Sequence, residues 1–240
     1  MDTRFWGPSA WQLFHLIAFR SEHPDDVLNK IKDILPCRYC RESTTDFTKK
    51  HPLRGDAGQW MYDIHNMVND KLRKQAAEDP AVIQPGPDPS FDCVRDRYMA
   101  MKPTHVPGRD FLFSVAFNYP DKPESTDMSN QREFVHALAE AYPFAPLRKV
   151  FKSYLKKNEV VLENRNRYMH WMYGLLKELS KSAGVAIRSY QGYAHHVAYY
   201  KSGCSRKTYH GKTCRKLSGG GYTKNRDHRK TYRISHRSLL

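Results

Sequence analysis

The sequence is poor in cysteine and has no long hydrophobic run. Its 240 residues contain five cysteines, of which only Cys37 and Cys40 lie two residues apart. A structural zinc site needs a second such pair, and Cys93, Cys204 and Cys214 do not provide one nearby. No stretch approaches the roughly eighteen apolar residues that a transmembrane helix requires, so no membrane span is expected.

The N-terminus also leaves little space for a targeting segment. The first motif begins at Trp6, and a secretory or transit peptide does not fit ahead of it. We therefore expect a protein that is made and kept in the cytosol, where thiols are normally reduced.

The pair Cys37 and Cys40 has the spacing of a redox-active dithiol. A thioredoxin-like motif would lie between a strand and a helix, whereas apolar residues recur at helical spacing before this pair. Pro36 interrupts that pattern, and proline is tolerated at a helix start but not in its interior. We therefore expect a new helix from Cys37 to about Lys50, whose dipole stabilises the first thiol as a thiolate.

Two clusters of polar and aromatic residues flank the dithiol in the sequence. Trp11 and His15 are four residues apart and share one face of a predicted helix. His65 and Asn69 share a face of a later predicted helix, with Asn66 beside them. Together these groups suit a planar cofactor rich in heteroatoms. The alternative is that each histidine is a hydrogen-bonded core residue.

Three motifs in this order carry a resemblance to a known family. They are Trp-Gly-x-x-x-Trp-x-x-x-His ending at His15, Pro-Cys-x-x-Cys ending at Cys40, and His-Asn-x-x-Asn-x-Lys-Leu ending at Leu72. Over about residues 4–100 the chain resembles the Erv/ALR family of FAD-linked sulfhydryl oxidases. The resemblance implies a bundle of four helices plus a short fifth that holds FAD beside the dithiol.

The resemblance also implies roles for these residues. Cys37 would be the solvent-side thiol that exchanges with a protein substrate, and Cys40 the flavin-side thiol. The implied reaction oxidises protein dithiols to disulfides and passes the electrons through FAD to dioxygen, giving hydrogen peroxide. The implied cofactor contacts are Gly7, Trp11, His15, His65, Asn66, Asn69, Lys71 and Lys74, with Tyr98 a further candidate at the nucleotide end.

One position departs from the family's pattern. Many members have a cysteine where Tyr62 stands, bonded to the cysteine of a later Phe-Asp-Cys, which here ends at Cys93. The resemblance therefore implies that this structural disulfide is absent. We expect Cys93 to be buried with a free thiol, or else to pair elsewhere.

The second half of the chain repeats features of the first. Residues 111–117 echo residues 13–19, and residues 142–148 fall where residues 35–41 fell. The run Trp-Met-Tyr at 171–173 repeats the same run at 60–62. These features, in the same order, suggest a degenerate second copy of the bundle. The alternative is an unrelated helical domain with an aromatic core.

The suggested second copy lacks the chemistry of the first. Phe113 replaces the histidine, Phe144 and Leu147 replace both cysteines, and Leu176 falls opposite His65. We therefore expect this region to be helical and structural, without disulfide exchange or flavin binding.

We predict an all-α protein with a catalytic domain at residues 1–102, a second helical domain at residues 103–200 and a basic tail at residues 201–240. The tail holds twelve Lys or Arg and one Asp, which gives it eleven of the chain's fifteen net positive charges. Such a composition predicts disorder. Its charge suits a polyanion such as nucleic acid, and a solvated tail without a partner is the alternative.

The cysteines of the tail allow several interpretations. Cys204 and Cys214 could form a structural disulfide, or a shuttle pair that relays electrons to the dithiol. They could also bind zinc together with nearby histidines, or remain as two free thiols.

A sulfhydryl oxidase in the cytosol is similar to those of large cytoplasmic DNA viruses. We therefore expect it in the host cytoplasm, at viral factories and in the virion, with the mitochondrial intermembrane space as the alternative. Because relatives are commonly dimers, we expect a homodimer. The competing hypothesis is a nucleic-acid-binding or virion structural protein with a vestigial oxidase module, but the complete set of motif residues favours the oxidase.

Overall fold

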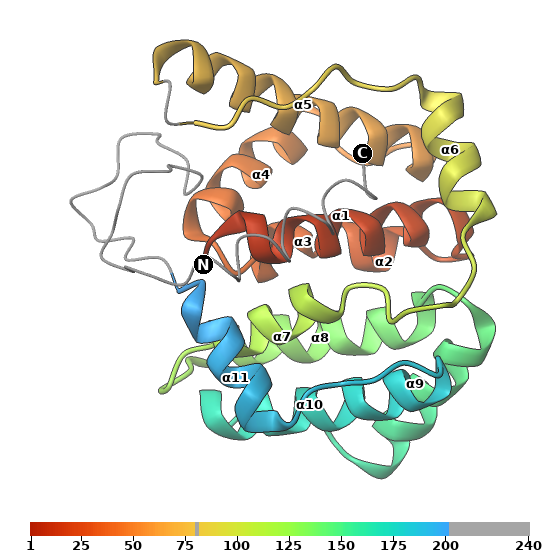
Figure 1. The fold of residues 1–240 in the computed structure, drawn as a ribbon, viewed down its shortest axis with the longest axis vertical. Helices are drawn as coiled ribbons and strands as arrows, with labels where there is room; N and C mark the ends of the chain where they lie inside the picture. Colours follow the sequence, from red (N-terminus) through yellow and green to blue (C-terminus); the bar gives the residue numbers. More distant parts are fainter. Residues whose placement is uncertain (80–81, 202–240) are drawn as a thin grey trace.

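The computed structural model describes residues 1–79 and 82–201 (Figure 1). Over these residues the protein has eleven helices and no strand, which confirms the predicted all-α class. The first six helices are α1 (Thr3–Arg20), α2 (Asp25–Leu28), α3 (Ile31–Ile34), α4 (Arg38–Lys50), α5 (Ala57–Glu78) and α6 (Phe91–Ala100). The other five are α7 (Arg109–Phe117), α8 (Ser125–Ala141), α9 (Ala145–Lys157), α10 (Arg165–Ser182) and α11 (Tyr190–Tyr199).

The helices form three layers, with the first three helices of the sequence in the middle one (Figure 1). Figure 1 shows α4, α5 and α6 at the top, α1 to α3 across the middle, and α7 to α11 below them. None of the helices described is long and apolar enough to cross a membrane. Cys204, Cys214 and the predicted tail beyond residue 201 lie outside the described residues.

The central helix α1 is held on several sides because much of its surface is apolar. Leu13, Leu16 and Ile17 are fully buried, and α1 packs against α5, α6 and α7. The side chain of Asp2 accepts a hydrogen bond from the amide of Arg4 and caps the first turn. This packing fixes the helix that carries the first predicted site cluster.

The dithiol lies at a helix start, as the sequence predicts. Cys37 is the N-cap residue of α4, with extended backbone angles, and its carbonyl oxygen accepts from the amide of Arg41. The apolar stretch before it is interrupted, because the chain turns at Asn29 and Lys30 between the short helices α2 and α3. Pro36 then separates α3 from α4.

The second half repeats the architecture of the first. Helices α4 and α9 each have thirteen residues, and the positions paired in the sequence, Cys37 and Phe144, are their N-cap residues. Arg41 donates to the carbonyl oxygen of Leu35 at 2.5 Å. The matching arginine, Arg148, donates to that of Tyr142 at 3.5 Å.

The repeated tryptophans make the same contact in both halves. The indole N–H of Trp60 on α5 donates to the carbonyl oxygen of His51, the residue that ends α4, at 2.9 Å. The indole N–H of Trp171 on α10 donates to that of Asn158, the residue that ends α9, at 3.1 Å. Each tryptophan thus ties one long helix to the end of the helix before it.

The repeated tyrosines fasten a short helix in each half. The hydroxyl of Tyr62 donates to the carbonyl oxygen of Pro89 at 2.9 Å, just before α6. The hydroxyl of Tyr173 donates to that of Arg188 at 2.8 Å, just before α11. Helices α6 and α11 each have ten residues and are capped by a serine side chain. These matched contacts show that the second half has the same helical plan as the first.

Cys93 has a free thiol, but the expectation that it is buried is wrong. It is exposed on α6. The inner face of this helix is formed by residues at helical spacing, Phe91, Val94 and Tyr98, and position 93 falls outside that stripe. Tyr62 packs its ring against Phe91 at 5.6 Å, so an aromatic contact joins α5 to α6 where the resemblance implies a disulfide in relatives.

The two halves differ in their backbone at the dithiol position. Phe144 has a φ of 66°, whereas Cys37 has a φ of −120°. A positive φ is costly for a residue other than glycine, and it persists only where surrounding contacts enforce it. Phe144 is buried, and the guanidinium of Arg20 lies 4.9 Å from its ring centre.

Corresponding helices of the two halves face each other. α1 packs on α7, and α2 packs on α8. The ring of Phe14 meets that of Phe111 edge to face at 5.2 Å, and the ammonium of Lys30 pairs with Glu133 at 2.7 Å. The buried apolar residues of both halves form one continuous cluster.

Candidate active site

The two cysteines differ in exposure. Cys37 is 4% exposed and belongs to the hydrophobic core, whereas Cys40, one turn into α4, is half-buried. In this structure Cys37 is thus the more buried of the two thiols, and its solvent-side place, which the resemblance implies, stays a prediction. Cys37 is buried because it closes the turn that follows Leu35, which is itself in the core. The chemical roles of the two thiols stay predictions.

The structure brings the two predicted histidines together. Nε2 of His15 on α1 lies 2.9 Å from Nδ1 of His65 on α5, so one ring donates a hydrogen bond to the other. Burial, and then the neighbouring His65, hold the pKa of His15 well below its ordinary value. His15 is therefore neutral at physiological pH.

The other ring nitrogen of His15 is an unsatisfied polar group. Its Nδ1 is buried and has no hydrogen-bond partner among the residues that the structure describes. Buried polar atoms are nearly always paired, so an orphan of this kind indicates a ligand or an ordered water. It lies in the cluster that the sequence proposed as a cofactor contact.

Aromatic rings extend this cluster on both sides. The ring of Trp11 stacks on that of His65, with 3.9 Å between centroids and 10° between planes. The ring of Tyr98 on α6 stacks on that of His15 at 4.7 Å and 13°. Burial raises the pKa of Tyr98 to about 12, so its hydroxyl stays protonated. Phe19, which no motif indicated, adds a further ring parallel to His15.

Gly7 lies on the same face of α1 as this cluster, because it precedes Trp11 by four residues. It is buried, and no described atom outside its own turn lies within 4 Å of the position that a Cβ would take. The space beside it is therefore open. No close backbone contact within the described residues requires glycine here.

The carboxamide and lysine candidates occupy the rest of α5. Asn66 is half-buried, and Lys74 is exposed more than two turns beyond it. The ammonium of Lys71 donates to Oγ of Ser43, which lies on α4 three residues after Cys40. This bond joins the helix of the dithiol to the helix of His65.

Asn69 is held by a residue that no sequence pattern indicated. Its Nδ2 donates to Oδ1 of Asp88 at 2.8 Å. Asp88 lies in the irregular segment between α5 and α6, among prolines and a glycine. The sequence there has no helical or strand periodicity from which the direction of its side chain could be predicted. Ser43 could have been found, because it shares a helical face with Cys40.

These residues fit a flavin. The parallel rings of Trp11 and His65 match a planar ring system, and the ring of His15 is tilted by 42° from that of His65. The orphaned Nδ1 of His15 offers a polar contact. Lys71 and Asn66 supply donors suited to phosphate and hydroxyl groups.

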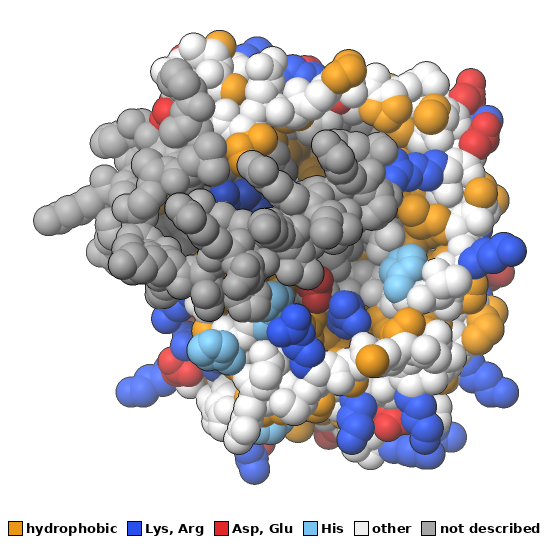
Figure 2. Space-filling view, in the orientation of Figure 1, with side chains coloured by type: hydrophobic (Ala, Val, Ile, Leu, Met, Phe, Trp, Pro, Cys, Tyr) orange, Lys and Arg blue, Asp and Glu red, His pale blue; other side chains and the backbone are white. Residues whose placement is uncertain are grey.

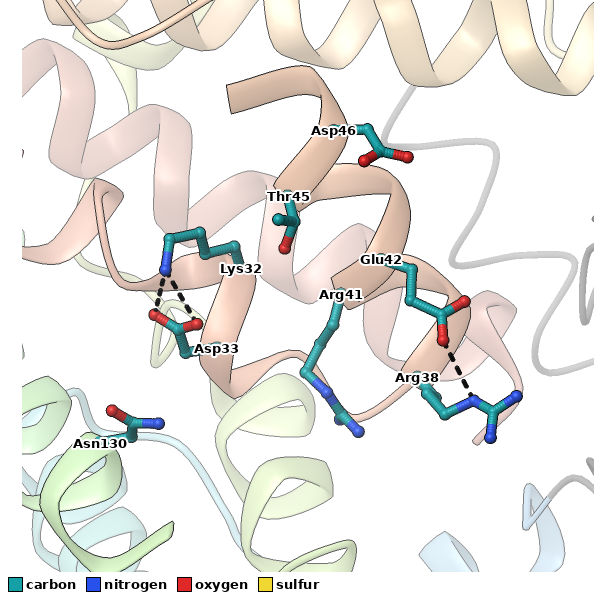
Figure 3. Close-up of a pocket in the computed structure, with 8 residues that line it drawn as sticks. All are labelled: Lys32, Asp33, Arg38, Arg41, Glu42, Thr45, Asp46 and Asn130. Atoms are coloured by element: carbon teal, nitrogen blue, oxygen red, sulfur yellow. Dashed lines mark hydrogen bonds and ion pairs between the residues drawn. The ribbon is translucent and has the colours of Figure 1, made fainter. Parts of the chain in front are cut away.

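A separate pocket lies on another face of α4. It has a volume of about 510 Å³, and Figure 3 shows side chains of α3 and α4 on one side and Asn130 of α8 on the other. Ion pairs between Lys32 and Asp33 and between Arg38 and Glu42 occupy its walls. None of the predicted cofactor residues lines it, so we do not assign the cofactor to it.

The chain matches the model of the Erv1 / Alr family over residues 8–85 and again over residues 110–184. The chain belongs to this family. The second match agrees with the repeated helices and contacts, and it confirms that the second half is a further Erv-like region. In that region Phe113, Phe144 and Leu147 stand where the first has its histidine and its cysteines.

The oxidase is similar to enzymes of viruses and of yeast. It is 34% identical over 84 residues to the FAD-linked sulfhydryl oxidase of African swine fever virus, covering 29% of this chain and 70% of the relative. It is 29% identical over 105 residues to the mitochondrial FAD-linked sulfhydryl oxidase ERV1 of Saccharomyces cerevisiae, covering 38% and 48%. A probable FAD-linked sulfhydryl oxidase of Acanthamoeba polyphaga mimivirus is 29% identical over 100 residues, covering 35% and 70%.

No solved structure matches the chain. The family and the names of these relatives identify the protein as a flavin-linked thiol oxidase with FAD as its cofactor.

Proposed function

We propose that the oxidase forms disulfide bonds in protein dithiols through Cys37 and Cys40. The observation that carries this proposal is the junction between α4 and α5. The Lys71 to Ser43 bond brings the dithiol helix against the helix of His65 and Asn69. This contact supports the proposal that the thiols and the candidate cofactor residues form one site.

The exchange uses the two sulfurs in turn. A substrate thiolate attacks Sγ of Cys37 in the Cys37–Cys40 disulfide, which forms a mixed disulfide and releases Cys40 as a thiolate. A second substrate thiolate then attacks the substrate sulfur of the mixed disulfide. The substrate leaves oxidised, and both cysteines of the oxidase are reduced.

Bound FAD supplies the two-electron acceptor that restores the dithiol to a disulfide and passes the electrons to dioxygen, giving hydrogen peroxide. Trp11, His15, His65, Asn66, Asn69 and Lys71 would hold it. The rings of Trp11 and His65 would orient a planar group, and Nδ1 of His15 and the amide of Asn69 would contribute hydrogen bonds. Because His15 is neutral, its open nitrogen offers a hydrogen bond without adding a charge.

The proposal extends to the substrates of the oxidase and to its location. The viral relatives favour action on proteins in the cytoplasm of an infected host cell, and the yeast relative keeps mitochondria as the alternative. The homodimer and the contact of the basic tail with polyanions stay predictions.

The visible spectrum of the purified protein tests the proposal. We expect flavin absorbance, together with oxygen consumption and equimolar hydrogen peroxide when dithiothreitol is added. A colourless protein that takes up no added FAD would contradict it. A yellow protein that leaves dithiothreitol unoxidised would show that FAD binds but would contradict the proposed reaction.

A further inference from the structure

The segment between α5 and α6 places a carboxylate on the predicted cofactor helix. Asp88 accepts from Nδ2 of Asn69 at 2.8 Å through one oxygen. Its other oxygen accepts from the guanidinium of Arg73 at 2.8 Å, and Arg73 also donates to the carbonyl oxygen of Gly86. Asp88 is thus fixed from both sides by residues of α5 and by its own segment.

This contact decides which way the carboxamide of Asn69 points. An ionised carboxylate has only acceptor atoms, so the group that faces it must be the NH₂ of Asn69 and not its oxygen. The hydrogen bond from Arg73 lowers the pKa of Asp88, with a smaller contribution from Asn69, which keeps the carboxylate ionised. The carbonyl oxygen of Asn69 is therefore directed away from Asp88.

We propose that Asp88 is a positioning residue that sets the amide of Asn69 so that its carbonyl oxygen accepts a hydrogen bond from a hydroxyl or amino group of FAD. The inference rests on the proposed place of Asn69 in the cofactor site. The partner of the Asn69 carbonyl oxygen would be a hydroxyl or amino group of the cofactor and not a phosphate, because a phosphate oxygen has no proton to donate.

A neighbouring aspartate provides a matched control. Asp70 also pairs with Arg73, at 2.7 Å, but it is exposed, and the amide of Asn69 donates to Asp88 instead. Asp70→Asn removes one carboxylate from the same guanidinium without changing the acceptor of Asn69. If Asp88 acted only by charge near Arg73, the two aspartates would behave alike.

The experiment measures FAD affinity in a double-mutant cycle, from the change in flavin fluorescence on binding. We expect Asp88→Ala to weaken FAD binding about tenfold and Asp70→Asn to leave it unchanged, as suits the loss of one hydrogen bond to a charged group. In an Asn69→Ala background, Asp88→Ala should have no further effect, because its action passes through Asn69.

The proposal would be overturned if Asp88→Ala weakened FAD binding as much in the Asn69→Ala background as in the wild-type background. It would also be overturned if Asp88→Ala left FAD affinity unchanged. If Asp88→Ala fails to fold by circular dichroism, Asp88→Asn replaces it. That variant keeps the shape but no longer dictates the amide, so it should weaken binding in the wild-type background alone. A wild-type protein that binds no FAD would reject the proposed function itself, and unchanged variants of a flavin-binding protein would reject only this inference.

Discussion

At the scale of single residues, the resemblance and the observed exposure indicate different cysteines as the one that a substrate thiolate attacks. Cys37 is the more buried sulfur, although the reaction requires one cysteine to be attacked by a substrate thiolate. We expect Cys40→Ser to retain FAD. When a substrate is added in its disulfide form, the Cys37 thiolate should attack that disulfide, release one substrate sulfur as a thiolate and keep the other in a mixed disulfide that Cys40 cannot resolve. Turnover should fall at least about a thousandfold, since an obligatory nucleophile is lost.

Mass spectrometry under non-reducing conditions identifies the trapped cysteine, and Cys37→Ser is the matched variant. An adduct found only on Cys40 in Cys37→Ser would reverse the two roles and would agree with the exposure instead. The expected result requires substrate binding to uncover Sγ of Cys37.

His15 gives a prediction on pH. Because burial and His65 lower its pKa in the folded protein, the unfolded chain binds a proton that the folded protein excludes below about pH 6.5. The stability that comes from a neutral His15 is present above that pH and is lost as the pH falls. Flavin-free wild-type protein should lose up to about 1.4 kcal/mol of unfolding free energy per pH unit more than His15→Phe.

Urea denaturation at several pH values measures this difference. His23→Gln, which changes an exposed histidine, serves as the control and should keep the wild-type slope. Parallel curves for wild-type and His15→Phe would contradict the prediction. Phenylalanine is a suitable replacement, because Phe113 stacks on Tyr193 in the corresponding place of the second half.

At the scale of helices, the contact between α1 and α7 depends on a glycine. Gly108 has a φ of 75°, and a Cβ there would lie 2.5 Å from Cδ2 of Leu13. Gly184 has a similar φ of 67° but open space around it. We expect Gly184→Ala to cost about 1 kcal/mol for the backbone alone, and Gly108→Ala about 1–3 kcal/mol more for the overlap.

Chemical denaturation of the two variants gives both values, and their difference isolates the helix contact. Equal destabilisation would mean that Leu13 moves aside without loss. The contact would then contribute little to the orientation of α1.

The helices that carry the motifs could be predicted from the sequence, whereas some contacts between helices could not. Pro36 and the apolar pattern located the start of α4 to within one residue, and the repeated Trp-Met-Tyr run located the second copy. The outward direction of Cys93 was missed because a family motif, and not the helical stripe of α6, guided the expectation. The positive φ of Phe144 and the hydrogen bonds of Asp88 with α5 depend on tertiary contacts, which a local sequence pattern does not predict.

At the scale of the whole molecule, the continuous core makes the two halves one unit. The boundary predicted near residue 102 stays a prediction. A fragment of residues 1–102 would expose apolar side chains that meet the second half, such as Phe14, whose ring contacts Phe111. We expect the full chain to unfold in a single transition, and the fragment to self-associate through the uncovered face.

Differential scanning calorimetry of the full chain tests the single transition, and light scattering tests the self-association of the fragment. Two separate transitions in the full chain, or a stable monomeric fragment, would show that the halves are independent. The same light-scattering measurement on the full chain tests the predicted homodimer.

The charge distribution gives a further prediction for the whole chain. The positive charges at residues 201–240 favour polyanions, whereas Figure 2 shows acidic and basic side chains interspersed on the visible part of the described surface. A chain ending at residue 200 should keep its oxidase activity and lose salt-sensitive binding to DNA. Fluorescence anisotropy at two salt concentrations measures the binding, and undiminished affinity would place the contact on the helices.

The backbone at Phe144 has a consequence for the history of the second copy. Two cysteines placed at positions 144 and 147 would restore the residue types of a dithiol, but the first would start from a φ of 66° and not from −120°. Its sulfur would therefore leave the chain in a different direction. We therefore expect that Phe144→Cys together with Leu147→Cys does not create a second redox centre unless the backbone at position 144 also changes.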